Sequence, residues 1–177
     1  MIFLMIARIL YDKGYAEYVN AAKIIRKKYP DTEFQLLGSI DIQYPNHVSE
    51  DSVMKDNENG TINYLGVSND VCSIIKKADC IVLPSYHEGL SRVLIEALAM
   101  GKPIITSAIP GCRETVDEGI NGYLVPPKNT EALADAFNRF ILLSDIERQK
   151  MGVYSRKKAE KEFDVKNVIA VYRKITG

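Results

Sequence analysis

A turn suited to binding an anion follows the apolar run Cys80–Leu83, which predicts a buried strand. Gly89 permits a sharp change of chain direction, and the residues after it are good helix formers. The amides of Gly89, Leu90 and Ser91 are therefore expected to point out of a helix start, where unpaired N–H groups attract negative charge. Glu88 lies beside them, in the loop before the helix.

Two glutamates bracket this turn, with Glu88 before it and Glu96 on the predicted helix Val93–Met100. A carboxylate at position 96 could accept hydrogen bonds from two adjacent hydroxyls, as an acidic residue does for the ribose in dinucleotide-binding folds. From these residues alone, two structural alternatives stay open. Glu96 could be an ordinary exposed helix residue, and Glu88 could be an anionic residue favoured by the positive end of the helix dipole.

Two cations follow the first predicted strand, Ile2–Ala7. Arg8 and Lys13 lie in the loop after this strand, with Gly14 next to Lys13. A guanidinium fork and an ammonium group at the carboxyl end of a strand suit a diphosphate. Taken alone, a surface Arg and a surface Lys are the simpler interpretation. Together with Glu88 and Glu96 further along the chain, binding of a diphosphate becomes the preferred interpretation of Arg8 and Lys13.

Apolar runs alternate with helical patterns along the whole chain. The predicted strands are Ile2–Ala7, Glu33–Leu37, Thr61–Leu65, Cys80–Leu83, Ile104–Thr106 and Gly122–Val125. The predicted helices are Tyr15–Tyr29, Val67 or Ser68 to Lys77 with Ser68 or Asn69 as the cap, Val93–Met100, a helix capped by Asn129 or Thr130, Asp145–Glu162 and Asp164–Ile175. The segment Ile40–Gly60 has little periodicity and predicts a surface loop.

This alternation predicts an α/β fold, a Rossmann-like, doubly wound parallel sheet of about six strands. In such a sheet the ligand lies beyond the carboxyl ends of the strands, where the strand order reverses. The 177 residues are expected to form one domain, residues 1–177.

The segment Pro84–Pro103 carries the pattern Pro-Ser-Tyr-x-Glu-Gly-x-x-Arg-x-x-x-Glu-Ala-x-Ala-x-Gly-x-Pro. It resembles the donor-binding half of retaining glycosyltransferases of family 4, which have two Rossmann-like domains in the GT-B architecture. The loop with Arg8 and Lys13 resembles the family's Gly-Arg-x-x-x-x-Lys-Gly loop, with Ala7 where glycine is usual. The segment Pro110–Val116 narrows the resemblance to bacterial enzymes that build lipid-linked oligosaccharides for surface polysaccharide.

The resemblance implies roles for individual residues. Arg8 and Lys13 are expected to hold the phosphates of the donor, and Glu88 to lie at the donor sugar and the reacting centre, which makes these three the expected catalytic residues. Glu96 is expected to hold the ribose of the nucleotide. Gly38, after the second strand, is expected to lie close to the nucleotide, although an ordinary turn is an equal alternative.

The composition excludes several classes of protein. Lys and Arg together equal Asp and Glu at 23 each, which argues against a dedicated nucleic-acid binder. The three cysteines do not form a disulfide framework, and with two histidines they lack the spacing of a zinc site. No apolar run approaches the roughly 20 residues that a membrane span needs. The donor site is expected to use neither a metal nor another cofactor, because no Asp-x-Asp pair is present.

The function implied by the resemblance is transfer of a sugar from a UDP-activated donor to a glycan or lipid-linked acceptor, with the anomeric configuration retained. The family's N-terminal acceptor domain is not recognised in this sequence, so the chain is expected to be a donor-binding half that is inactive by itself. A cytoplasmic location is expected, compatible with peripheral association of the full-length enzyme at the inner face of the plasma membrane. The alternatives are a nucleotide-sugar epimerase with the same architecture and a non-catalytic nucleotide-binding module.

Overall fold

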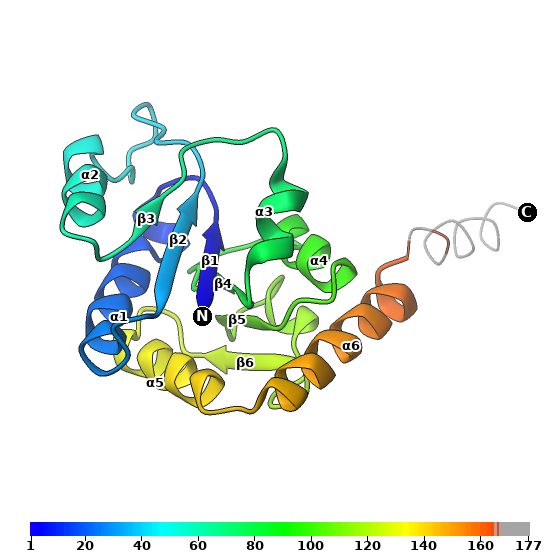
Figure 1. The fold of residues 1–177 in the computed structure, drawn as a ribbon. Coiled ribbons are helices and arrows are strands. Elements are labelled where there is room, and N and C mark those ends of the chain that lie inside the picture. The colour runs from blue at the N-terminus through cyan, green and yellow to red at the C-terminus, as the bar shows by residue number, and fades with distance from the viewer. Residues whose placement is uncertain (165, 167–177) are drawn as a thin grey trace, which may run out of the picture.

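The computed structural model describes residues 1–164 and 166 of the chain. Within them, six parallel strands form one sheet in the order β3-β2-β1-β4-β5-β6 (Figure 1). The strands are β1 (Ile2–Ile6), β2 (Glu33–Leu37), β3 (Asn63–Tyr64), β4 (Cys80–Leu83), β5 (Ile104–Ser107) and β6 (Gly122–Val125). The predicted doubly wound α/β fold is confirmed, and β3 is shorter than expected.

The helices alternate with these strands. They are α1 (Tyr15–Lys28), α2 (Glu50–Glu58), α3 (Val71–Lys77), α4 (Arg92–Ala99), α5 (Thr130–Ile141) and α6 (Asp145–Glu162), with short 3₁₀ turns η1 (Tyr11–Lys13) and η2 (Arg113–Thr115). The predicted helix Asp164–Ile175 lies outside the described residues, apart from Asp164 and Lys166.

The prediction of a surface loop over Ile40–Gly60 is wrong, because the helix α2 occupies its second half. Ser49 caps this helix by accepting a hydrogen bond from the Ser52 amide at 3.3 Å. Val53 is the only residue of α2 whose side chain is buried. A helix with so narrow an apolar face gives little periodic signal in the sequence, and its cap was the one local indication of it.

The cap of α3 also differs from the prediction. The helix begins at Val71, and Asp70 accepts a hydrogen bond from the Ser73 amide at 3.0 Å. Ser68 instead accepts a hydrogen bond from the amide of Asp70 at 3.0 Å, so it supports the cap without being the cap. Asp and Ser are both strong capping residues, and spacing alone did not distinguish them.

Two hydrophobic clusters pack on opposite faces of the sheet, because neighbouring residues of a strand point to opposite sides. Phe3 and Met5 belong to the cluster under α1 and α5, where the rings of Phe3 and Phe137 lie 4.6 Å apart. Leu4 and Ile81 belong to the cluster under α3, α4 and α6. Figure 1 shows these two groups of helices on the two sides of the sheet.

The strand order fixes where a ligand would lie. The chain moves outward in one direction from β1 through β2 to β3, and in the other direction from β4 through β5 to β6. The order therefore reverses between β1 and β4, whose residues pair from Phe3 with Cys80 to Met5 with Val82. Open α/β sheets bind ligands beyond the carboxyl ends of the strands at such a reversal.

Candidate functional site

The loops that follow β1 and β4 meet at this reversal. The carbonyl oxygen of Asp12 accepts hydrogen bonds from the Tyr86 amide at 2.8 Å and from Ser85 Oγ at 3.2 Å. Gly14, at φ 82°, packs so closely that a Cβ there would lie 2.2 Å from the carbonyl oxygen of Pro84. This approach requires glycine at position 14, and the two loops form one unit.

The contact between the loops brings two predicted site residues together. Lys13 Nζ donates a hydrogen bond to Glu88 Oε1 at 2.8 Å and another to the carbonyl oxygen of His87 at 3.4 Å. The Lys13 and Glu88 side chains are only 18% and 16% exposed. Because the pair is shielded from water, its attraction is less screened than that of a surface ion pair. The roles assigned to these two residues stay predictions.

A cavity of about 310 Å³ opens beside this pair. Its lining comes from the ends of β1 and β4, the loops after them and the start of α4. The lining residues are Ile6, Ala7, Arg8, Lys13, Leu83, Glu88, Leu90, Ser91, Arg92 and Val93. Three of these side chains are cations and one is a carboxylate, so the cavity carries a net positive charge and favours an anion.

Arg8 reaches the cavity from the end of β1 and is held from its other side by the segment after β2. Its guanidinium carbon lies 4.2 Å from the centre of the Tyr44 ring, and its Nη1 lies 3.8 Å from Asp41 Oδ2. The pKa of Arg8 is raised above its ordinary value. Tyr44 is the largest cause of this rise, and the negative charge of Asp41 adds to it. Arg8 is therefore a permanent cation at the cavity.

The start of α4 differs from the prediction. The helix begins at Arg92 with Ser91 as its N-cap, so Gly89, Leu90 and Ser91 precede the first turn. The Ser91 amide donates a hydrogen bond to the carbonyl oxygen of Gly111 at 3.1 Å and is not free for an anion. The Ser91 side chain makes no capping bond, which leaves the first amides of α4 itself without a side-chain partner.

The loop after β5 packs against this turn. Gly111, at φ 85°, lies so near that a Cβ there would fall 1.4 Å from the carbonyl oxygen of Gly89. Glu114 Oε2 accepts a hydrogen bond from the Gly111 amide at 2.8 Å and fixes the loop. The sequence analysis did not find this role for the segment after β5, although its Pro-Gly pair was a signal of a tight turn.

Gly89 does not line the cavity, and neither do two other predicted site residues, Gly38 and Glu96. Gly38 lies where β2 ends, and a Cβ there would be 1.8 Å from the carbonyl oxygen of Ala7, so close packing of the two strand ends already accounts for glycine. Glu96 is exposed on α4. It is four residues after Arg92 and three after Val93, both of which line the cavity, so it lies on the same helix face. The nucleotide roles of Gly38 and Glu96 stay predictions.

The sequence analysis also missed a buried pair behind the site. Tyr86 Oη donates a hydrogen bond to Glu17 Oε1 at 2.7 Å, and Glu17 is 9% exposed. Burial, followed by this bond to Glu17, raises the pKa of Tyr86 well above its ordinary value, so the phenol keeps its proton. The pair ties α1 to the loop that carries Glu88. Tyr86 belongs to the glutamate motif, but nothing in the spacing indicated its partner.

Cys112 is buried close to the ion pair of Lys13 and Glu88. The pKa of its thiol is raised to about 11. Burial is the largest cause of this rise, and the carboxylate of Glu88 also contributes to it. At neutral pH the thiol is protonated and is a poor nucleophile. Cys112 therefore belongs to the packing of the site and supplies no reactive group.

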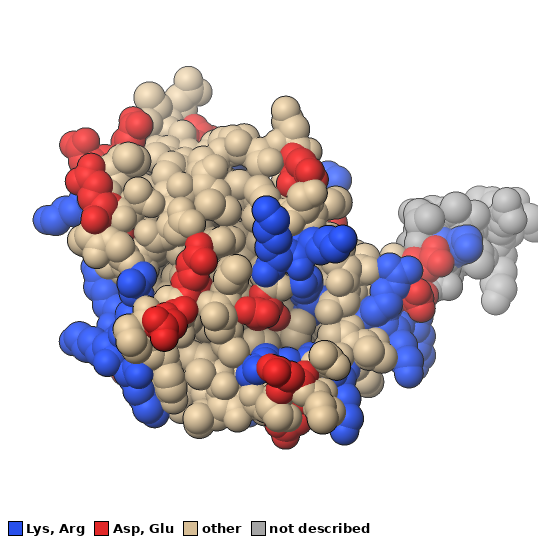
Figure 2. Space-filling view, in the orientation of Figure 1, with Lys and Arg blue, Asp and Glu red and all other residues tan. Residues whose placement is uncertain are grey.

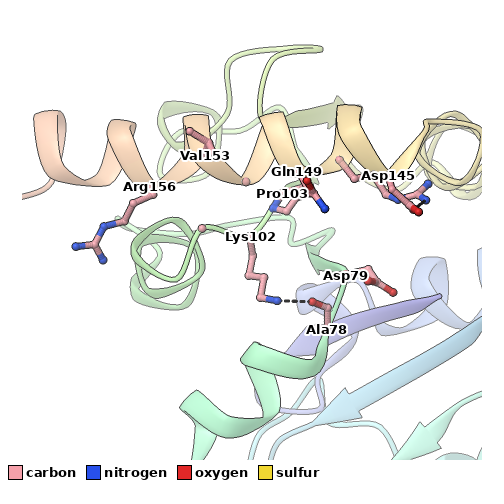
Figure 3. Close-up of a pocket in the computed structure, with 11 residues that line it drawn as sticks. Ala78, Asp79, Lys102, Pro103, Asp145, Gln149, Val153 and Arg156 are labelled. Atoms are coloured by element: carbon pink, nitrogen blue, oxygen red, sulfur yellow. Dashed lines mark hydrogen bonds and ion pairs between the residues drawn. The ribbon is translucent and has the colours of Figure 1, made fainter.

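The largest cavity, of about 620 Å³, lies at the opposite end of the sheet, between α6 and the starts of β4 and β5 (Figure 3). Its cations already have partners within the chain. Lys102 Nζ donates to the carbonyl oxygens of Lys76 and Ala78, both at 2.7 Å, and Arg156 Nε donates to Glu160 at 2.7 Å. This cavity also lies away from the carboxyl ends of β1 and β4, so the candidate site is the smaller cavity.

The face of the molecule in Figure 2 carries charges of both signs. Figure 2 shows Lys and Arg gathered on the outer side of α1 and along α6, with Asp and Glu among them on other elements. The basic residues in the last turn of α1 are Arg26, Lys27 and Lys28. These positions lie away from the cavity, whose charge comes from a few residues at the strand ends.

Two absences hold for residues 1–164 and 166, the part of the chain that the structure describes. Among them, no group of three or more His, Cys, Asp and Glu side chains is arranged to hold a metal ion. None of their helices is both long enough and apolar enough to cross a membrane.

Residues 1–158 match the model of the family described as glycosyl transferases group 1. Among curated relatives, the N,N'-diacetylbacillosaminyl-diphospho-undecaprenol alpha-1,3-N-acetylgalactosaminyltransferase of Campylobacter jejuni is 33% identical over 81% of this chain and 36% of its own length. The capsular polysaccharide biosynthesis glycosyltransferase CapM of Staphylococcus aureus is 28% identical over 89% of this chain and 41% of its own length. The chain thus spans less than half the length of either relative.

Solved structures with a similar fold include glycosyltransferases. A glycosyltransferase from Rickettsia africae superimposes with a TM-score of 0.84 and 28% identity over 98% of this chain and 47% of its own. Anabaena Alr3699/HepE, solved in complex with UDP, superimposes with a TM-score of 0.86 and 22% identity over 98% of this chain and 48% of its own. At that identity the second likeness supports the fold alone.

Proposed function

The chain belongs to the glycosyl transferases of group 1, and from this premise we propose that it binds the UDP-activated sugar donor of a bacterial transferase that retains the anomeric configuration. The cavity between the β1 and β4 loops takes the diphosphate of the donor. The relatives described above carry the names of transferases, which supports this function over an epimerase or a non-catalytic module.

One observation carries the proposal. Arg8 and Lys13 from the first loop and Glu88 from the fourth strand's loop, far apart in the sequence, line one cavity at the reversal of the strand order. The uncapped start of α4 lines the same cavity through Arg92 and Val93. Two cations, a helix N-terminus and the position in the sheet all favour an anionic nucleotide at this place.

The chemistry follows from the charges around the cavity. When the bond between C1 of the sugar and the diphosphate oxygen breaks, negative charge develops on the leaving phosphate. Arg8, Lys13 and the positive end of α4 stabilise that charge, and because they are fixed before the reaction they need not reorganise. Protein cations then take the part that a divalent metal plays in other transferases, so the donor site works without a metal. Glu88 lies at the donor sugar.

The proposal extends to the acceptor and the location. We infer a glycan or lipid-linked acceptor from the name of the Campylobacter jejuni relative, whose acceptor carries diphospho-undecaprenol. Additional chain of the full-length protein contributes the acceptor side of the cleft. The proposed location is the cytoplasm, including the inner face of the plasma membrane, where a lipid-linked acceptor is within reach.

Thermal unfolding with UDP, GDP, ADP and uridine tests the proposal. A ligand at 100 times its dissociation constant stabilises a protein by about 2.7 kcal/mol, which corresponds to roughly 5 to 10 °C for a chain of this size. We expect UDP to raise the midpoint more than GDP or ADP, with the same rise in EDTA. Uridine, which lacks phosphates, should give a smaller rise.

The outcomes separate the parts of the proposal. If no nucleoside diphosphate stabilises the chain, the donor-binding function is wrong. A rise that disappears in EDTA would contradict metal-free binding but keep the donor site. A larger rise with GDP than with UDP would change the donor and leave the diphosphate site in place.

A further inference from the structure

The segment between β2 and α2 is folded back onto the loop that carries Arg8. The Ile9 amide donates to the carbonyl oxygen of Ser39 at 2.9 Å, and the Tyr11 amide donates to that of Asn46 at 2.9 Å. In return, the Val48 amide donates to the carbonyl oxygen of Ile9 at 3.2 Å. Backbone bonds at both ends thus fix residues 39–48 against the Arg8 loop, at the carboxyl edge of the sheet in Figure 1.

Internal bonds shape the middle of this segment. The Tyr44 amide donates to the carbonyl oxygen of Asp41 at 3.0 Å, and the His47 amide donates to that of Tyr44 at 3.1 Å. His47 Nδ1 lies 2.7 Å from the same Tyr44 oxygen. These bonds form consecutive turns, and the turns present Tyr44 and Asp41 to Arg8.

We propose that Tyr44 is a positioning residue for diphosphate binding, because its ring supports one face of the Arg8 guanidinium at the wall of the cavity. A guanidinium donates hydrogen bonds from its edges and stacks through its faces. An aromatic ring on one face restrains the side chain through that face. The N–H edges of Arg8 stay available to phosphate oxygens.

Asp41 has a weaker part in this arrangement. Its carboxylate lies 3.8 Å from Arg8 Nη1, and the Arg8 and Asp41 side chains are 44% and 33% exposed. Ion pairs of this kind contribute little in water. A carboxylate also competes with phosphate for the same donors, whereas a ring does not. The inference therefore rests on Tyr44, and it rests on the proposed function because it takes Arg8 as a ligand of the diphosphate.

Calorimetric titration of this chain with UDP and with uridine tests the inference. Tyr44→Leu should weaken UDP binding about two- to fivefold, the range for a partly exposed stack of cation and ring. Tyr44→Phe keeps the ring and should bind UDP like the parent chain. Ile42→Ala is the matched control, since Ile42 lies in the same segment and is 72% exposed. Uridine affinity should be equal in all four proteins.

A double-mutant cycle identifies Arg8 as the partner. In the Arg8→Ala background, Tyr44→Leu should cause no further loss of UDP affinity, because the side chain that Tyr44 positions is gone. A merely structural role of Tyr44 would weaken UDP and uridine alike, in both backgrounds. Melting curves of each variant without ligand report any loss of folding separately.

Three results would overturn the inference. The first is that Tyr44→Leu binds UDP as tightly as Ile42→Ala does. The second is that Tyr44→Phe and Tyr44→Leu lose equal UDP affinity. The third is that Tyr44→Leu weakens UDP binding as much in the Arg8→Ala background as in the parent chain. Failure of the proposed function has a different signature, because the parent chain itself would then not bind UDP.

Discussion

The six α-helices of the described residues begin in two ways. Four of them have a side-chain cap that accepts a hydrogen bond from an amide of the first turn. The capping residues are Ser49, Asp70, Asn129 and Ser144, before α2, α3, α5 and α6. The helices α1 and α4 begin after Gly14 and Ser91, and neither residue provides a side-chain cap.

The two uncapped helices are the ones that follow β1 and β4, the strands on either side of the reversal. A cap satisfies amides that would otherwise need water or a ligand, so capped helix starts have already used some of their donors. The start of α4 keeps them at the cavity, which it lines through Ser91, Arg92 and Val93.

The largest expected effect is that of Lys13, a cation that lines the cavity. Lys13→Ala should weaken UDP binding about ten- to a hundredfold, because a hydrogen bond to a charged group contributes about 1.5 to 3 kcal/mol. The loss of uridine affinity should be much smaller. Lys150→Ala, an exposed lysine on α6, is the control in the same calorimetric titration and should leave both affinities unchanged. An equal loss for UDP and uridine would assign Lys13 to folding.

Glu96 tests how far the ligand site extends along α4. Glu96→Ala should weaken UDP roughly tenfold or more, because two hydrogen bonds from ribose hydroxyls to a carboxylate are lost. The 2′,3′-dideoxy analogue of UDP should bind the parent chain and the variant equally in calorimetry. If the variant binds UDP as tightly as the parent, the ligand does not reach past Arg92 and Val93.

Serines at the two kinds of helix start give a third test. Ser144 forms a capping box with Glu147, so Ser144→Ala should lower the free energy of unfolding by about 1 kcal/mol, or roughly 2 to 4 °C in the midpoint. Ser91→Ala should change it by less than about 0.5 kcal/mol, since no cap is lost. Denaturant unfolding gives both free energies, and thermal unfolding gives the shift of the midpoint. Comparable losses in the two variants would contradict the distinction between helix starts.

The smallest expected effect is a gain. Glu88→Gln removes the negative charge that pairs with Lys13 and leaves its ammonium for the diphosphate alone. UDP should bind about two- to threefold more tightly, while sugar transfer by the full-length enzyme should be lost. The comparison uses calorimetry for binding and a radiolabelled donor for transfer. Weaker UDP binding would mean that Glu88 mainly keeps Lys13 in place.

The strands, and the edge of the sheet where Lys13 and Glu88 meet, could be predicted from the sequence, for a physical reason. Buried parallel strands are continuous apolar runs, as in Cys80–Leu83, and residues after such strands must meet at one edge of the sheet. This argument placed Lys13 and Glu88 at the same edge without their partners being known. It could not show that they form an ion pair, because the pairing depends on side-chain conformations.

The helix α2, the contacts of Tyr44 and Glu17, and the start of α4 could not be predicted from the sequence. The helix α2 buries only Val53, so it lacks the periodic face on which the prediction depends. Tyr44 and Glu17 act through contacts with Arg8 and Tyr86, and no local spacing encodes such pairs. The start of α4 shifted because Ser91 bonds to Gly111, a residue of another loop. Tertiary contacts decided each of these cases.

The pairing of β1 with β4 has a consequence for folding kinetics. Lys13 and Glu88 are separated by 75 residues, so their contact forms only after a long loop has closed and its entropy has been lost. A nascent chain that ends at Lys77 carries both cations of the first loop but no cavity for them to line. Nucleotide binding would therefore report completion of the central sheet, and an intermediate in which β1 has paired only with β2 should be invisible to UDP.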